Sequence, residues 1–174
     1  MIEYWDEEGD PADFALCINP FGVKIKTNGK ARMLVDPSIT GVNSSMQKLP
    51  CILTTPEAFM GTVKPTNVLG KRDLTNGFYH ITLHTSARKY MGFIHPTTGR
   101  LGRWIALPQG TRQSPHYFVE LTNFSREVFN HKFREAGVEA SCDVYVDDYP
   151  MRASTHQDMV DAFTIMDEEA QLLG

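Results

Sequence analysis

Hydrophobic and polar positions change their period several times along the 174 residues, and these changes predict a succession of strands and helices. Apolar residues alternate with polar ones over short stretches that end at glycine, proline or asparagine, a pattern typical of strands and hairpins. Such stretches occupy residues 21–26, 30–35, 68–72, 80–83, 90–94 and 103–107. The first two flank Asn28-Gly29, a dipeptide that favours a tight hairpin turn.

Helical spacing of apolar residues appears in three places. A short helix is predicted to start at Pro56, with Thr55 as its N-cap, because proline suits the first helical position. A long helix is predicted over residues 114–136, with Gly137 as its stop. Thr155 is predicted to open the last helix. Together, these elements predict an α+β fold, in which helices pack on one face of an antiparallel sheet.

Charge is distributed unevenly along the chain, although the net charge is only −4. Residues 1–13 hold six acids and no lysine or arginine, which predicts an acidic, poorly ordered lead-in before a fold that begins at residue 14. Residues 156–174 hold five more acids, so residues 14–155 carry all 17 basic residues against 10 acidic ones, a net +7. A basic middle suits a surface that follows phosphates, and an ordinary mixed surface is the alternative.

Composition and motif counts exclude several classes of protein. Hydrophobic content of 41% and charged content of 22% are ordinary for a globular domain, and no apolar run approaches a membrane span. The N-terminus lacks the features of a secretory signal. The three cysteines (Cys17, Cys51 and Cys142) form neither a zinc spacing nor a disulfide framework, and the six histidines show no ligand spacing. We therefore expect a protein of a reducing, intracellular compartment without a membrane partner.

The candidate chemistry centres on residues 143–151, Asp-Val-Tyr-Val-Asp-Asp-Tyr-Pro-Met. Strand formers lead to Asp147 and Asp148, and apolar residues resume after them, which predicts a β-hairpin with both acids at its tip. Neighbouring side chains in a strand point to opposite faces, so two acids presented together need a turn. Carboxylates are hard ligands that suit Mg²⁺ or Mn²⁺. For this motif alone, a solvated Asp-Asp turn is the alternative.

Three further segments accompany the acidic hairpin. Residues 24–36 form a basic hairpin. Residues 73–79, Asp-Leu-Thr-Asn-Gly-Phe-Tyr, place an acid at a strand end, before a glycine and an aromatic residue. Residues 107–115 contain Leu-Pro-Gln-Gly and Ser-Pro, a rigid turn into a helix. In order and separation, the four segments resemble the fingers and palm of reverse transcriptases of the retrovirus and LTR-retrotransposon kind, over roughly residues 15–173.

The resemblance implies one fingers–palm domain over residues 14–174 and the activity of an RNA-directed DNA polymerase. In that family three aspartates hold two Mg²⁺ ions, with Mn²⁺ as a substitute. The matching positions are Asp73, Asp147 and Asp148, together with the backbone carbonyl of Leu74. Nucleotidyl transfer needs the attacking hydroxyl and the leaving pyrophosphate clamped in line, and two metals roughly 3.5–4 Å apart achieve this from a stiff carboxylate platform.

The resemblance also implies a deoxynucleotide site. Arg32 matches a fingers arginine that contacts the triphosphate, and Lys26 matches its accompanying lysine. Lys24 is an alternative ligand, because the hairpin departs from the commoner Lys-Lys-Asp-Gly pattern. Gln109 matches a glutamine near the incoming sugar and base. Phe78 matches an aromatic ring that excludes a ribose 2′-hydroxyl; the alternative is that Phe78 belongs to the core and Tyr79 is the exposed ring. The remaining implied contacts are Asn76 and Gly77.

The implied partners are an RNA or DNA template with its primer, deoxynucleoside triphosphates and the remaining polyprotein segments. Those segments are a thumb and an RNase H and, in larger polyproteins, a protease and an integrase. We expect residues 1–174 alone to bind primer–template weakly. The expected compartment of the protein is the cytoplasm or the nucleus. The rival interpretations are a catalytically silent nucleic-acid-binding relic and an RNA-templated RNA polymerase, although the latter typically presents Gly-Asp-Asp.

Overall fold

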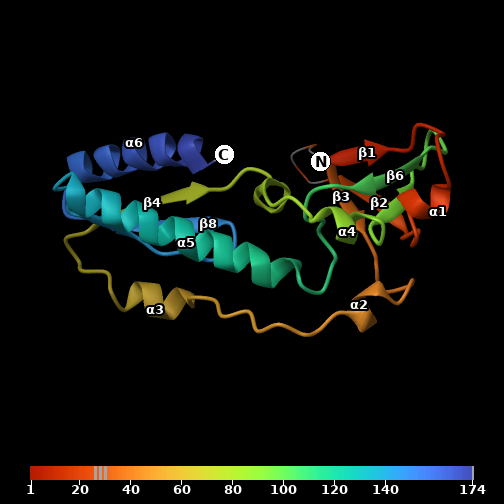
Figure 1. The fold of residues 1–174 in the computed structure, drawn as a ribbon. Coiled ribbons are helices and arrows are strands. Elements are labelled where there is room, and N and C mark those ends of the chain that lie inside the picture. Colours follow the sequence, from red (N-terminus) through yellow and green to blue (C-terminus); the bar gives the residue numbers. More distant parts are fainter. Residues whose placement is uncertain (26, 28, 30, 174) are drawn as a thin grey trace. The chain divides into compact units, whose positions relative to one another are not determined.

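The computed structural model describes residues 1–25, 27, 29 and 31–173 and divides the chain into two compact units (Figure 1). Unit 1 comprises Met1–Leu49 and Phe78–Ser114, and unit 2 comprises Pro50–Gly77 and Pro115–Gly174. Each unit therefore combines two separate stretches of sequence. The motifs predict a single domain from residue 14 onward, whereas the contacts within the structure separate those residues into two units and include the N-terminal segment in the first.

Unit 1 contains two antiparallel sheets (Figure 1). The three-stranded sheet has the order β1-β6-β5, and the other is a two-stranded ribbon of β2 and β3. The strands are β1 (Ile2–Tyr4), β2 (Phe21–Ile25), β3 (Ala31–Val35), β5 (Gly92–Ile94) and β6 (Leu101–Trp104). Short helices connect them: α1 (Pro11–Phe14), α2 (Val42–Ser45) and α4 (Thr85–Arg88). The predicted hairpin of residues 21–35 is confirmed for the part of it that the structure describes.

The N-terminal segment differs from the predicted poorly ordered lead-in. β1 pairs with β6, with Ile2 opposite Trp104 and Tyr4 opposite Gly102. Ile2 and Tyr4 share one face at strand spacing, and both pack against an aromatic core around Phe93 and Trp104, which are fully buried. Burial of these two apolar side chains stabilises the strand despite the acids that follow it.

The predicted strand over residues 80–83 is wrong. Of these residues, all of them described, His80 is the last residue of a 3₁₀ turn, η1 (Gly77–His80), and the others make one isolated bridge, between Thr82 and Ala106. The Tyr79 ring stacks on Trp104 with centroids 5.4 Å apart, and its hydroxyl donates to the Met33 carbonyl oxygen over 3.3 Å. These contacts hold the 3₁₀ turn at the start of the segment. Residues 81–83 keep only the hydrogen bonds around the single bridge, from the Leu83 amide to the Ile105 carbonyl oxygen and from the Leu107 amide to the Ile81 carbonyl oxygen, although the local pattern favours a strand.

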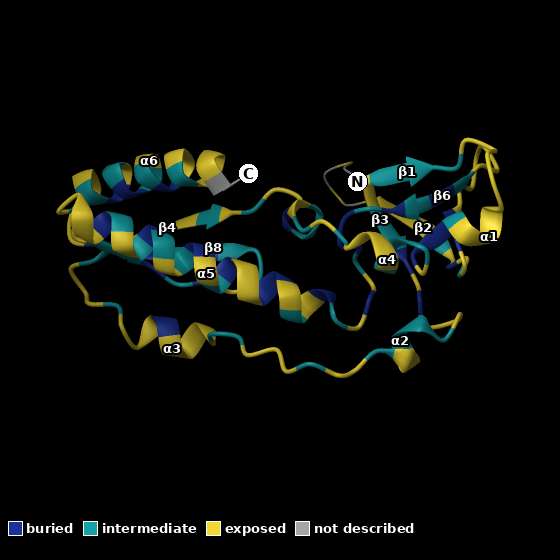
Figure 2. Ribbon diagram, in the orientation of Figure 1, coloured by how far each residue is buried: buried dark blue, intermediate teal, exposed yellow. Residues whose placement is uncertain are grey.

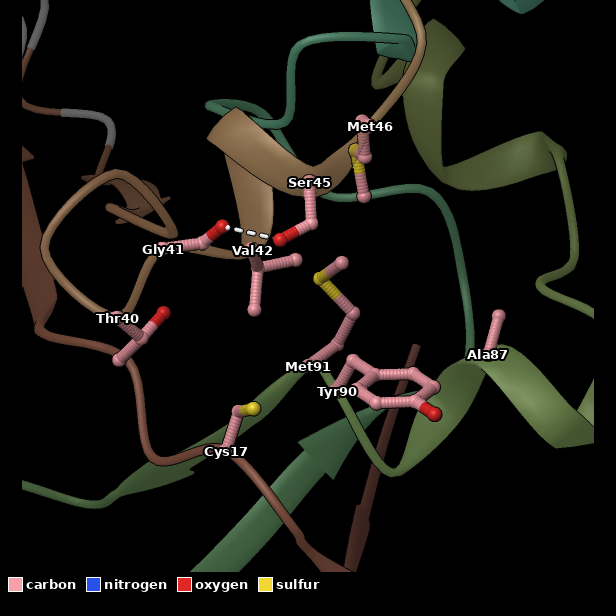
Figure 3. A pocket seen from close by; sticks show the side chains of 9 residues that line it. All are labelled: Cys17, Thr40, Gly41, Val42, Ser45, Met46, Ala87, Tyr90 and Met91. Atoms are coloured by element: carbon pink, nitrogen blue, oxygen red, sulfur yellow. Dashed lines mark hydrogen bonds between the residues drawn. The ribbon is translucent and has the colours of Figure 1, made fainter.

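Unit 1 also contains a cavity of about 300 Å³, which Figure 3 shows from close by. Val42 of α2 and Met46, which follows α2, line it, together with Tyr90, Met91 and the Cys17 side chain. None of its lining residues carries a charge. A phosphate needs cationic or N–H donors around it, so this apolar cavity is not suited to a nucleotide.

Unit 2 is built on a three-stranded antiparallel sheet with the order β4-β8-β7. Its elements are α3 (Pro56–Met60), β4 (Val68–Asp73), α5 (Ser114–Glu135), β7 (Ala140–Cys142), β8 (Asp148–Ala153) and α6 (His156–Leu173). Alternate residues of β8 are buried: Tyr149, Met151 and Ala153. They form one core with Phe129 and Phe133 of α5 and with Met159, Ala162 and Met166 of α6. Both long helices therefore cover the same face, which confirms the predicted fold class (Figure 2).

Local sequence signals determine where the helices of unit 2 begin and end. Thr55 caps α3 by accepting from the Ala58 amide, and Thr155 caps α6 by accepting from the Asp158 amide. Gly137, with a φ of 69°, follows the end of α5. These ends agree with the sequence prediction. No helix in the described part of the chain is both long and apolar enough to span a membrane.

Candidate active site

Three carboxylates gather at one end of the unit 2 sheet. Asp73, the last residue of β4, lies directly opposite Asp148, the first residue of β8. Tyr149 faces the helices, so the alternation of a strand places Asp148 on the opposite face. We call this the open face because neither α5 nor α6 covers it, although Asp148 lines a pocket there together with Phe59 of α3. One carboxylate oxygen from each of Asp73, Asp147 and Asp148 lies within 4.8 Å of the others. Strand register thus brings together acids that are far apart in sequence.

A two-residue turn presents Asp147 beside this pair. The Tyr145 amide donates to the Asp148 carbonyl oxygen over 2.8 Å, and the Asp148 amide donates back to the Tyr145 carbonyl oxygen over 3.0 Å. Val146 and Asp147 are therefore the turn residues, and the tip lies one residue earlier than predicted. The Leu74 amide donates to the Asp147 carbonyl oxygen over 2.9 Å, which ties the turn to the end of β4.

Val146 adopts a left-handed conformation, with a φ of 59°. Glycine usually occupies the first central position of such a hairpin turn, because a β-branched side chain is strained there. Strain of this kind costs about 1–3 kcal/mol and persists where the surrounding structure over-determines it. The paired strands and the bond from Leu74 to Asp147 supply that constraint. The strained residue lies directly before the acids.

The acids influence one another electrostatically. The pKa of the Asp73 carboxyl is raised, first by partial burial and then by the negative charge of Asp147 and by its contacts with Asp148. The Lys71 ammonium lowers the pKa of Asp73. It also forms an ion pair with Asp148, with Nζ 2.8 Å from Oδ1. The hydrogen bond to Asp148 in turn raises the pKa of Lys71. The cluster thus concentrates negative charge, and one ammonium compensates part of it.

A buried contact fixes β8 directly after Asp148. The Ser125 hydroxyl donates to carbonyl oxygens of its own helix, α5, so the Tyr149 hydroxyl donates to Ser125 Oγ, at 2.6 Å. The Tyr149 ring also packs edge-on against Phe129, with centroids 5.6 Å apart. Burial raises the pKa of Tyr149 to about 12, so its hydroxyl remains a donor at neutral pH. This contact anchors the acidic end of β8 to α5.

Asn76 and Gly77 have structural reasons for their identity. Asn76 has a φ of 58°, which asparagine tolerates better than most residues. Gly77 is buried, and a Cβ there would lie 2.6 Å from Cζ of the Phe118 ring. The chain can therefore turn away from β4 soon after Asp73 only if the residue at position 77 lacks a side chain.

The predicted phosphate-contacting cations lie on the ribbon of unit 1. Arg32 of β3 lies directly opposite Lys24 of β2, and both residues are exposed. Like charges directly opposite one another destabilise a strand pair, so an anion between them would be favourable. Burial raises the pKa of Tyr79, whereas the nearby Arg32 charge lowers it. Lys26 lies outside the described residues.

Gln109 and Phe78 also belong to unit 1. The Gln109 carbonyl oxygen accepts from the Val35 amide over 3.3 Å, so its loop is attached to the end of β3. A Cβ at Gly110 would collide with the Val35 carbonyl oxygen, and its φ of 119° also favours glycine. Phe78 is half-buried in η1. The roles of these residues toward a nucleotide stay predictions.

Sequence reasoning missed two features of the acid cluster. Lys71 pairs with Asp148, and its signal was its place two residues before Asp73, which puts both side chains on the same face of a strand. The strained conformation of Val146 had no comparable signal, because valine favours ordinary strands.

Comparisons with known proteins bear on the family and the fold of the chain. The family model described as "Reverse transcriptase (RNA-dependent DNA polymerase)" matches residues 25–174. A solved structure of the foamy viral protease-reverse transcriptase dRH, in complex with double-stranded DNA, is 18% identical with a TM-score of 0.77. The match covers 99% of this chain and 27% of that chain, and it shows a shared fold. A search of curated proteins finds no match.

Proposed function

Because the chain belongs to the reverse transcriptase family, we propose that it carries the catalytic centre of an RNA-directed DNA polymerase. This polymerase adds deoxynucleotides to a primer 3′ end on an RNA or DNA template. The observation that carries the proposal is the approach of three carboxylates to within 4.8 Å at the end of a covered sheet.

The donor set fits divalent metal ions. Carboxylates of Asp73, Asp147 and Asp148 are the hard oxygen ligands that Mg²⁺ and Mn²⁺ prefer, and the Leu74 carbonyl is proposed as a further ligand. Partial burial is the first cause of the raised pKa of Asp73, and the neighbouring negative charges of Asp147 and Asp148 raise it further; a bound cation would relieve that repulsion. When bound, two such ions would lower the pKa of the primer hydroxyl and neutralise charge on the leaving pyrophosphate.

The chain itself contributes a rigid arrangement of these ligands. Asp73 and Asp148 are held by the pairing of β4 with β8, and Asp147 by a turn that bonds to Leu74. The Tyr149–Ser125 bond and the helices behind the sheet oppose movement of β8. Polymerisation needs reacting groups held in line, and ligands supported in this way limit misplacement of the primer end.

The ribbon of unit 1 would bind the triphosphate. Arg32 and Lys24 present two cations side by side, and Lys26 is proposed to assist them. Cationic side chains that embrace a phosphate chain supply charge neutralisation and positioning without covalent chemistry. Gln109 would hydrogen-bond near the sugar and base, and the Phe78 ring would exclude a ribose 2′-hydroxyl, with Asn76 and Gly77 lying beside that sugar.

Template–primer is the proposed nucleic-acid partner. The solved relative binds double-stranded DNA, and the segment of residues 14–155 carries a net +7. Positive charge promotes binding to phosphate backbones in a salt-dependent manner. The chain spans 27% of the length of that relative, and we propose that thumb and RNase H segments, as well as a protease or integrase, act beside it in the same polyprotein.

The proposal is tested by Asp147→Asn in the protein that carries this chain. We expect primer extension to fall by about 100-fold or more, because a direct metal ligand is lost, while primer–template binding is nearly unchanged. Asp143→Asn is the matched control. Asp143 precedes the same hairpin but pairs with Arg126 and Arg152, outside the cluster. Substantial extension by the Asp147 variant would contradict the proposal, and nucleic-acid binding without extension by the unaltered protein would favour a relic.

A further inference from the structure

Lys71 is the residue through which the acid cluster contacts a positive charge. It lies in β4, two residues before Asp73, and strand alternation puts both side chains on the open face of the sheet. Its Nζ lies 2.8 Å from Asp148 Oδ1, with 60% of the lysine side chain and 33% of the aspartate side chain exposed. Of the ion pairs among the described residues, this is the one that reaches the cluster.

The next residue provides an internal comparison. Arg72 points to the other face of the same strand, where its NH2 group pairs with Asp167 of α6 over 2.7 Å. Its guanidinium also lies 4.2 Å from the ring centroid of Phe163. Two consecutive cations of β4 thus serve different purposes: Arg72 attaches the strand to α6, and Lys71 lies against the carboxylates.

We propose that Lys71 is a positioning residue of the metal site: it holds the Asp148 carboxylate until a divalent ion arrives and competes with that ion for it. This inference rests on the proposed function. Three carboxylates within 4.8 Å repel one another, and the ammonium offsets part of that repulsion in the absence of metal. An exposed ion pair is weak, so a doubly charged ion can displace it.

The competition has a consequence for the order of binding. An ammonium that occupies one Asp148 oxygen lowers the affinity of the protein for free metal. A nucleotide brings phosphate oxygens as additional ligands, and Mg²⁺ is commonly held by carboxylates together with substrate phosphates. We infer that the site fills with metal mainly in the presence of nucleotide, so that Lys71 disfavours a metal-loaded site without substrate.

Binding of Mn²⁺ to the whole chain, measured by electron paramagnetic resonance without nucleic acid or nucleotide, tests the inference. Lys71→Met removes the competing ammonium, and we expect the Kd for Mn²⁺ to fall about 2- to 5-fold, the range that an exposed ion pair allows. Lys71→Arg keeps the charge and should remain near the unaltered chain. Arg72→Met removes one positive charge from the neighbouring residue on the other face, so a general charge effect would appear there equally.

Each outcome supports or contradicts the proposed role of Lys71 at the metal site. A lower Kd in Lys71→Met alone, or Mn²⁺ binding that appears in that variant only, supports the inference. An unchanged Kd, equal changes in Lys71→Met and Arg72→Met, or no detectable binding in any chain overturns it. Asp147→Asn separates this from the proposed function: if that variant binds Mn²⁺ as the unaltered chain does, the cluster is not the metal site and both proposals fail. If it loses binding while Lys71→Met changes nothing, only the inference on Lys71 fails.

Discussion

The two units present their candidate functional groups on different kinds of scaffold. In unit 2 the acids lie at the end of a three-stranded sheet whose middle strand, β8, has every second residue buried under two helices. In unit 1 Lys24 and Arg32 lie on a two-stranded ribbon, and four of the five residues of β2 are exposed. A two-stranded ribbon alone is only marginally stable, whereas a covered sheet is held by its core.

This difference matches what each group has to do. Metal ligands act only within narrow distance limits, so their backbone must be fixed by register and packing. Positive charges that attract a triphosphate act over a longer range and tolerate variation in side-chain position. We therefore interpret unit 2 as the part that sets the geometry of the reaction and the ribbon of unit 1 as an adaptable electrostatic contact.

The largest expected effect tests the packing difference itself. Met151 in β8 is fully buried, and Met151→Ala should lower the free energy of unfolding by about 2–5 kcal/mol through lost burial and a residual cavity. Val23 in β2 is 50% exposed, and Val23→Ala should change the free energy of unfolding by less than about 0.5 kcal/mol. Urea denaturation followed by circular dichroism measures both. Equal losses would contradict the distinction between the two scaffolds.

A smaller effect is expected from the aromatic residue proposed to select the sugar. Phe78→Ala opens space and removes a ring that offers no partner for a 2′-hydroxyl, whose unsatisfied burial costs roughly 1–3 kcal/mol. The preference for deoxynucleotides should therefore decrease by about 5- to 150-fold in kcat/KM, measured by single-nucleotide addition in the protein that carries this chain. Tyr79→Ala is the control, because Tyr79 packs on Trp104. An unchanged ratio in an active Phe78 variant would show that another residue selects the sugar.

The smallest effect concerns the ionisation of Asp73, which partial burial and then the charges of the acid cluster disfavour. The pKa of Asp73 in the folded chain lies above its usual value of 3.8, so the folded state binds its proton more tightly than the unfolded state does. The stability due to this group is fully present below pH 3.8 and is lost as the pH rises through the folded pKa. Asp73→Asn should therefore stabilise the metal-free chain at pH 7 by less than about 1 kcal/mol, since exposed charges are screened. This gain in stability from Asp73→Asn should vanish at acidic pH.

Asp158 provides the control of opposite sign. Its pKa is lowered, chiefly by the hydrogen bond with Thr155 at the start of α6. Its contribution to stability is therefore present above its usual pKa and lost as the pH falls through the lowered one. Asp158→Asn should destabilise the chain at pH 7, and urea midpoints at several pH values compare the two variants. A pH-independent gain for Asp73→Asn would show that repulsion is not its cause.

Part of the candidate site was predictable because it depends on short-range rules. The pairing of β2 with β3, the caps at Thr55 and Thr155 and the acidic hairpin depend on local backbone preferences. The sequence mispredicted the strand at residues 80–83, where the chain instead forms the end of a 3₁₀ turn and a single bridge to Ala106. The helical spacing of Phe118, Leu121 and Ser125 predicts one buried face of α5, but Leu121 is 37% exposed while Thr122 is fully buried. The face that a helix buries depends on its neighbours.

The sequence by itself determined the fold class, the order of the motifs and the identity of the three acids, since periodicity and residue chemistry are local properties. Only the tertiary structure decided that Asp73 lies opposite Asp148, that Lys71 pairs with Asp148, and that Val146 is held in a left-handed turn. Each of these depends on strand register, a relation between distant segments. A shift of one residue would move every side chain of a strand to the other face, so burial of Tyr149 and Met151 against the helices fixes the acids on the open one.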